Sequence, residues 1–148
     1  MNKIFIKKFF YSSKKYFSSK MTKHSKLIVI GAGTGGLSVA NQLNNQKIIN
    51  ARDITIFDPA NNHFYQPGFT KIAGGVIESE YLINNWVRYD MKELTSKFNF
   101  HNEAVKSVDP EKNSIQTENG DTWTYEHLVI SSGLKLNKDS IPGKIIVI

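Results

Sequence analysis

Lys26-Leu-Ile-Val-Ile-Gly31-Ala-Gly-Thr-Gly-Gly36 opens the part of the chain with the most informative pattern. The β-branched run before Gly31 is typical of a strand that is buried on both faces. Glycines follow at once, and after Gly36 the apolar residues recur at helical spacing, at Leu37, Ala40 and Leu43. This segment therefore predicts a strand, a glycine-rich turn and a helix, in that order.

The glycines of this turn predict a phosphate-binding site. Gly31 permits a tight turn, Gly33 lets the backbone approach a pyrophosphate, and Gly36 lets the helix pack closely against the strand. The amides around Thr34 and Gly35 then lie at the N-terminus of the helix, where partial positive charge favours a diphosphate. We therefore expect the turn to bind a dinucleotide.

A second strand is expected at 53–57, and it ends at Asp58. A carboxylate there can accept hydrogen bonds from both hydroxyls of an adenosine ribose, and it repels a 2′-phosphate. The alternative is a solvated carboxylate that helps to form a turn with Pro59. The sequence of strand, turn, helix and strand favours dinucleotide binding, and it leaves NAD and FAD undistinguished.

Residues 97–133 follow a different pattern, in which short alternating runs are separated by turns of the Asn-Gly type. This pattern predicts a β-meander with strands at 98–100, 103–109, 114–117 and 122–125. An apolar strand follows from Tyr125 and ends in a turn of small residues at Gly133. The fold class predicted is α/β, a Rossmann-like βαβ unit with an inserted β-meander.

Two segments between these units are also interpretable. Residues 62–75 contain glycines and a proline and predict a loop, in which aromatic side chains and the Gln66 amide can form the wall of a cofactor site. The alternative is that these aromatic residues only fill the core. Residues 81–94 have apolar residues at helical intervals and predict an amphipathic helix that covers the sheet.

Composition narrows the chemistry that the chain can perform. It has 148 residues and no cysteine, which excludes a disulfide framework, thiolate metal sites and thiol chemistry carried by the chain itself. The four histidines, at positions 24, 63, 101 and 127, show no ligand spacing, so no metal site is expected. No apolar run approaches the roughly 20 residues that a membrane-spanning helix needs.

The net charge of +6 is distributed unevenly. Residues 1–26 hold eight of the 19 basic residues and none of the 13 acidic ones, so this part carries +8 and the remainder −2. A basic, acid-free segment with serines and aromatic residues predicts that residues 1–25 are a mitochondrial transit peptide; the alternative is a disordered basic leader. Because no basic stripe continues beyond it, nucleic-acid binding is not expected.

The stretch His63-Phe-Tyr-Gln-Pro67, with the glycines that follow it, resembles the HFYQP segment of sulfide:quinone oxidoreductases, particularly the mitochondrial type. The resemblance covers roughly residues 25–140. It extends to the wider pyridine-nucleotide–disulfide reductase superfamily, in which a Rossmann unit precedes a three-stranded meander. Phe69 stands where the family usually has tryptophan, and Lys71 replaces an apolar residue.

The resemblance implies FAD as the cofactor and assigns residues to it. Thr34 and Gly35 would bind the FAD diphosphate, Asp58 the ribose and Gln66 another part of the FAD, while the backbone of Val105 would meet the adenine. Gly133 would lie close to the diphosphate. Residues 26–148 would be the N-terminal part of an FAD/NAD(P)-binding domain, and this domain would be incomplete.

In the resembling family, a cysteine pair oxidises sulfide to sulfane sulfur, and the electrons pass through FAD to ubiquinone at the inner mitochondrial membrane. That pair is absent here, so no catalytic residue is assigned, and the chain alone is expected to lack sulfide oxidation and to bind FAD weakly. Membrane contact would come from a C-terminal part beyond residue 148. The alternatives are a fragment of another FAD-dependent oxidoreductase, such as a type II NADH dehydrogenase, and a non-catalytic dinucleotide-binding module.

Overall fold

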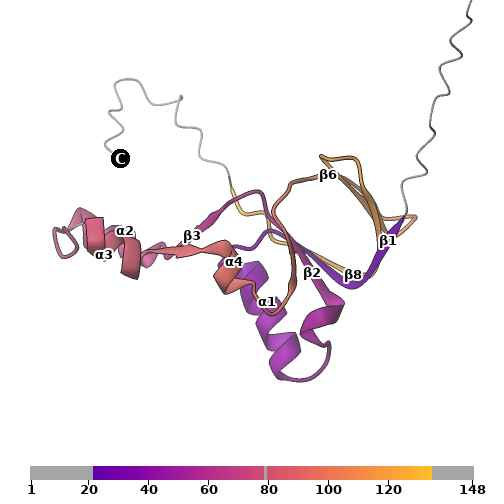
Figure 1. Ribbon diagram of the computed structural model, residues 1–148, viewed down its shortest axis with the longest axis horizontal. Helices are drawn as coiled ribbons and strands as arrows, with labels where there is room; N and C mark the ends of the chain where they lie inside the picture. The colour runs from indigo at the N-terminus through magenta and orange to yellow at the C-terminus, as the bar shows by residue number, and fades with distance from the viewer. Residues whose placement is uncertain (1–21, 79, 135–148) are drawn as a thin grey trace, which may run out of the picture.

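A computed structural model describes residues 22–78 and 80–134 (Figure 1). A six-stranded sheet forms the body of the molecule, in the order β5-β2-β1-β8-β7-β6. The strands of the predicted Rossmann unit come first: β1 is Lys23–Ile30 and β2 is Ile54–Phe57. They are parallel and are connected by helix α1, Thr34–Asn45, and a short 3-10 helix at Ala51–Asp53. The predicted βαβ unit is therefore confirmed.

The second half of the chain completes the sheet. Strands β6 (Val105–Asp109), β7 (Ser114–Thr117) and β8 (Thr122–Ile130) form an antiparallel meander. The predicted meander strand at 122–125 and the apolar strand after it are a single element. β8 pairs with β7 through its first half and runs parallel to β1 along its length. One long strand thus joins the meander to the parallel sheet.

The prediction that 98–100 belongs to the meander is wrong. This segment forms β5, Asn99–His101, which pairs in parallel with β2 at the opposite edge of the sheet. β5, β2, β1 and β8 are therefore four parallel strands, and the chain order reverses on either side of β1. Ligands of such sheets bind outside the carboxyl ends of the strands at this reversal.

Residues 62–90 form an arm that extends away from the sheet (Figure 1). It consists of β3 (Asn62–Phe64), α2 (Pro67–Ala73), α3 (Glu80–Trp86) and β4 (Arg88–Asp90), with β3 and β4 paired antiparallel. The prediction that 62–75 is an irregular loop is therefore wrong. Pro67 occupies the first turn of α2, where a missing N–H costs nothing.

The predicted helix over 81–94 is also wrong in extent and position. It is divided into α3, β4 and the short helix α4, Met91–Leu94. Asp90 starts α4 as a separate helix, because its carboxylate accepts hydrogen bonds from the amides of Lys92 (2.7 Å) and Glu93 (3.4 Å) and so caps the N-terminus of α4. Helix α4 reaches the core through buried Met91, whereas Trp86 at the end of α3 is 62% exposed.

Two apolar clusters hold the body together, one on each face of the parallel sheet. The first packs α1 and α4 against the sheet and includes Leu27, Val29, Ala40, Ile56 and Met91. The second lies between the parallel strands and the meander, and includes Ile28, Phe57, Ile115, Trp123 and Tyr125. Both faces of β1 are thus covered, as its β-branched sequence predicts.

Strand β1 begins at Lys23, three residues before the predicted start of the domain at residue 26. The rest of the predicted leader, and the end of the chain from residue 135, lie outside the described residues. Within the part that the structure describes, no helix is long and apolar enough to cross a membrane.

Candidate dinucleotide site

The predicted phosphate-binding turn lies at the carboxyl edge of the parallel strands, between β1 and α1. Gly31 has a φ of +97°, and a Cβ there would lie 2.4 Å from the Ser131 carbonyl oxygen. A Cβ on Gly36 would lie only 1.9 Å from the Gly31 carbonyl oxygen. These two glycines are required by the close packing of α1 and of Ser131, after β8, on the turn.

Gly33 has a different environment, because no atom of the described residues lies within 4 Å of the position that its Cβ would take. Its φ of −69° and ψ of −175° are open to any residue, so the fold itself does not require glycine there. Gly33 is the N-cap of α1, and within 22–78 and 80–134 no side chain caps the helix at this end. The first amides of α1, at Thr34 and Gly35, therefore face open space that an anion can enter.

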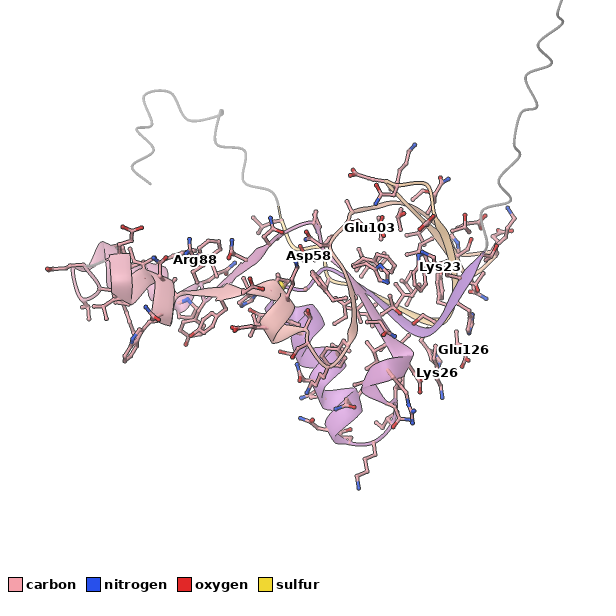
Figure 2. All side chains as sticks on the ribbon, viewed as in Figure 1. Lys23, Lys26, Asp58, Arg88, Glu103 and Glu126 are labelled. Carbon is pink, nitrogen blue, oxygen red and sulfur yellow. The ribbon has the colours of Figure 1, made fainter. Side chains whose placement is uncertain are left out.

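Asp58, labelled in Figure 2, follows β2 and contacts the glycine turn through its carboxylate. One carboxylate oxygen accepts a hydrogen bond from the Ala32 amide at 2.7 Å, and the other accepts from the Ala60 amide at 2.8 Å. Lys23, Lys26 and Glu126 lie at the other end of the sheet in the same view. The carboxylate is thus fixed beside the turn, with lone pairs left for a ribose hydroxyl.

Two residues of this edge were missed by the sequence analysis. Ser131, after β8, donates from Oγ toward the carbonyls of Gly31 (3.0 Å) and Ile30 (3.2 Å), and its amide donates to Ile30 at 2.8 Å. Asn102, after β5, donates from Nδ2 to the carbonyls of Asp58 and Ala60, both at 3.0 Å. The run of small residues after β8 could have indicated Ser131 as a residue of the site, whereas no local sequence pattern indicates Asn102.

Gly133 and Val105 are placed differently by the structure. Gly133 follows Ser131 at the carboxyl edge with a left-handed φ of +69° and open space around its Cβ position. Val105 lies in β6, the outer strand of the meander, and its side chain packs against the second apolar cluster. No hydrogen bond among the described residues connects Val105 to the glycine turn, so its contact with an adenine stays a prediction.

A cavity of about 470 Å³ lies between α1 and the arm, next to the glycine turn. Its lining comes from the first half of α1, with Thr34 and Leu37, and from the arm, with His63, Tyr65 and Pro67. Gln66 is exposed at the N-cap of α2. The HFYQP segment thus forms part of the wall of a mainly apolar cavity next to the predicted diphosphate site.

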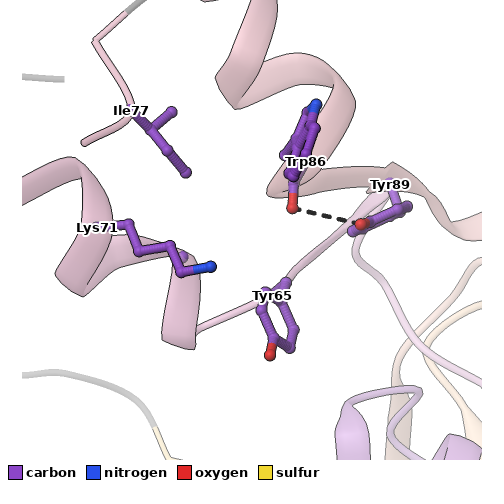
Figure 3. A pocket seen from close by; sticks show the side chains of 6 residues that line it. Tyr65, Lys71, Ile77, Trp86 and Tyr89 are labelled. Atoms are coloured by element: carbon purple, nitrogen blue, oxygen red, sulfur yellow. Dashed lines mark hydrogen bonds between the residues drawn. The ribbon is translucent and has the colours of Figure 1, made fainter.

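A second hollow of about 200 Å³ lies within the arm itself (Figure 3). Tyr65, Lys71 and Trp86 line it, and the Tyr89 hydroxyl donates to the Trp86 carbonyl at 3.3 Å. Gly68 is required here because a Cβ would lie 2.7 Å from Val87 Cγ2. This packing keeps α2 against Val87, between α3 and β4, and so fixes the position of the HFYQP segment.

His101 connects the site to the core behind it. Its carbonyl accepts a hydrogen bond from the Asp58 amide at 3.2 Å, and its ring stacks on Phe57 at 5.1 Å between centroids. Burial lowers the pKa of His101, and Glu103, 3.8 Å away, opposes that shift. His101 therefore stays neutral in the folded protein near neutral pH. Among the described residues, no group of three or more potential ligands could hold a metal ion.

This geometry is accompanied by clear similarity to known proteins. The family model for pyridine nucleotide-disulphide oxidoreductases matches residues 25–146. The chain therefore belongs to the pyridine nucleotide-disulphide oxidoreductase family, and its fold is the Rossmann-like fold of that family.

Within this family, the resemblance to sulfide:quinone oxidoreductases is confirmed. The chain is 34% identical over 124 residues to the mitochondrial sulfide:quinone oxidoreductase of Dictyostelium discoideum, a match that covers 84% of this chain and 26% of that protein. The crystal structure of the sulfide:quinone oxidoreductase from Aquifex aeolicus superposes with a TM-score of 0.62 and 32% identity, over 79% of this chain and 26% of that one.

A probable NADH dehydrogenase from Dictyostelium discoideum is 30% identical over 130 residues, or 84% of this chain and 27% of that protein. The chain thus spans about a quarter of the length of the relatives it matches.

Proposed function

We propose that this chain binds FAD at the carboxyl edge of the parallel sheet, as the N-terminal cofactor-binding part of an enzyme that oxidises sulfide and reduces a quinone. The observation that carries the proposal is the contrast between two glycines of one turn. Gly36 is required by packing, whereas Gly33 has open space around it and no structural reason to be glycine. A diphosphate that needs close approach to the backbone provides that reason.

The chain's own residues would bind and orient the cofactor. The open amides of Thr34 and Gly35 would donate to the diphosphate, and the fixed Asp58 carboxylate would accept from the adenosine ribose. Gly133, on the same edge, leaves room for the diphosphate. Gln66 and the aromatic residues of the HFYQP segment would line the far end of the cofactor, and Val105 would meet the adenine.

FAD, when bound, supplies two-electron redox chemistry. The choice of sulfide as donor and quinone as acceptor rests on the relatives' names and on the HFYQP segment. Because the chain has no cysteine, it provides no thiolate to attack or carry sulfur. We therefore assign cofactor binding to this chain and no catalytic residue. The mitochondrial sulfide:quinone oxidoreductase of Dictyostelium discoideum favours mitochondria as its location, in keeping with the predicted basic leader.

A type II NADH dehydrogenase is the second candidate, because the probable NADH dehydrogenase of Dictyostelium discoideum is 30% identical. That enzyme class would use the same FAD site with a different electron donor. The HFYQP segment, which lines the cavity beside α1, favours the sulfide-oxidising class.

The test of FAD binding is a calorimetric titration of the 148-residue chain with FAD. Gly33→Ala is expected to weaken binding at least about tenfold, because the new methyl group occupies the open space that the diphosphate needs. Its melting temperature should stay close to wild type, since nothing lies within 4 Å of the added atom. Gln42→Ala, on the exposed surface of α1, is the matched control and should bind FAD like wild type. Equal affinity of Gly33→Ala and wild type would contradict the proposal.

A further inference from the structure

Asn102 connects two parts of the candidate site through its side-chain amide. It lies directly after β5, and its Nδ2 donates to the carbonyl oxygens of Asp58 and Ala60, each at 3.0 Å. The Asp58 amide also donates to the His101 carbonyl at 3.2 Å. The end of β5 therefore holds the backbone that carries the Asp58 carboxylate at three points.

The Asp58 carboxylate itself makes its contacts on the other side. It accepts from Ala32 in the glycine turn at 2.7 Å and from Ala60 at 2.8 Å. Ala60 is thus bound through its amide to Asp58 and through its carbonyl to Asn102. This closed set of hydrogen bonds fixes the segment 58–60, which would otherwise be an exposed connection containing Pro59.

From this geometry we propose that Asn102 is a positioning residue that sets recognition of the adenosine ribose through Asp58. The inference rests on the proposed FAD site. A hydrogen bond between a carboxylate and a hydroxyl depends steeply on distance and direction. Loss of the Asn102 donor would release the 58–60 segment and weaken recognition of the ribose hydroxyls, with the diphosphate contacts of α1 left intact.

The chain supplies a matched control on the same strand. Asn99, at the other end of β5, donates from Nδ2 to the Arg52 carbonyl at 2.6 Å, away from the glycine turn. Asn99 and Asn102 are therefore the same residue type with the same kind of bond to a backbone carbonyl. A substitution of either one removes a side-chain anchor of β5, but only Asn102 contacts the Asp58 segment.

The experiment compares the binding of ADP and 2′-deoxy-ADP to the full chain by calorimetry. Wild type is expected to prefer ADP by about tenfold, the value of one hydrogen bond to a charged group. Asn102→Ala and the isosteric Asn102→Asp should lower this preference to about threefold or less, whereas Asn99→Ala should retain it. Asp58→Asn is the reference variant, because it shows how far the preference for ADP falls when the carboxylate itself is lost.

The possible results distinguish failure of the proposed ribose site at Asp58 from failure of the positioning role of Asn102. If wild type binds neither nucleotide, or binds both equally, the ribose assignment of Asp58 fails and this inference fails with it. If wild type and both Asn102 variants prefer ADP to the same extent, the site stands and the positioning role of Asn102 is refuted. An equal loss of preference in Asn99→Ala would also refute it, because the effect would then be a general one of destabilising β5.

Discussion

Substitution of Gly36 by alanine tests the packing of α1 on the glycine turn. The added Cβ would lie 1.9 Å from the Gly31 carbonyl oxygen and 2.6 Å from Ser131 Oγ, so helix and turn would have to separate by about 1 Å. The turn cannot yield easily, because Gly31 has a φ of +97° and is itself packed against the Ser131 backbone. Strand β8 is held there by the hydrogen bond from the Ser131 amide to Ile30 at 2.8 Å.

Two effects of opposite sign determine how much Gly36→Ala changes the free energy of unfolding. Alanine is favoured over glycine within a helix by about 1 kcal/mol. Overpacking of a site without room costs about 1–3 kcal/mol, and more where backbone must move. Because the contact here is with a backbone carbonyl, we expect the steric cost to lie above this range, at about 3–4 kcal/mol, and to exceed the helical gain. Gly36→Ala should lower the free energy of unfolding by about 2–3 kcal/mol.

Urea unfolding of the 148-residue chain, followed by circular dichroism, measures this loss. The midpoint should fall by about 1–2 M for a domain of this size. Gly35→Ala is the control, since its Cβ would meet only Ser131 Cβ at an ordinary 3.8 Å, and it should raise stability by up to about 1 kcal/mol. A midpoint for Gly36→Ala at or above that of wild type would refute the steric argument.

Two further predictions concern the core behind the site. Because burial lowers the pKa of His101 below its ordinary 6.5, the unfolded chain binds the proton more readily. The free energy of unfolding should therefore fall as the pH drops through and below 6.5. His101→Phe should reduce this pH dependence in urea titrations at pH 5 to 8. The same pH profile in wild type and His101→Phe would contradict the assignment to His101. Trp123 Nε1 is buried and has no hydrogen-bond partner among the residues that the structure describes. Trp123→Phe should therefore change the unfolding free energy by no more than about 1 kcal/mol, because relief of the unpaired donor offsets the lost volume. A loss of about 3 kcal/mol would show that this donor is satisfied.

Local patterns were sufficient to predict the Rossmann unit and the meander. The run Leu27–Ile30 and the glycines after it carry local signals for a strand, a turn and a helix, and the structure forms β1 and α1 there. The contacts that complete the turn are distant in sequence, since Asp58 accepts a hydrogen bond from the Ala32 amide and Ser131 packs against Gly31. The assignment of β5 failed because its partner, β2, lies over 40 residues earlier in the chain. The spacing of apolar residues and the turn residues alone do not identify which strand a short segment will pair with.

The arm shows a second limit of sequence patterns. The helical spacing of apolar residues correctly indicated helices at α3 and α4. Between them, Arg88–Asp90 pairs with β3 through contacts that are distant in sequence. Proline and glycine suggested an irregular loop at 62–75, yet Pro67 starts α2 and Gly68 allows its close contact with Val87. Asn102 could not be found from sequence, since its role depends on how β5 ends beside Asp58.

An amide-resolved NMR titration of the 148-residue chain with ADP and FAD tests the central claim most directly. Diphosphate binding at the glycine turn predicts the largest shifts at Gly33, Thr34 and Gly35, with further shifts at Ala32 beside Asp58 and at Gly133 across the edge of the sheet. FAD should add shifts at His63 and Tyr65, which line the cavity beside α1. Shifts confined to other surfaces, or no shifts at millimolar nucleotide, would contradict the assignment of this edge as the dinucleotide site.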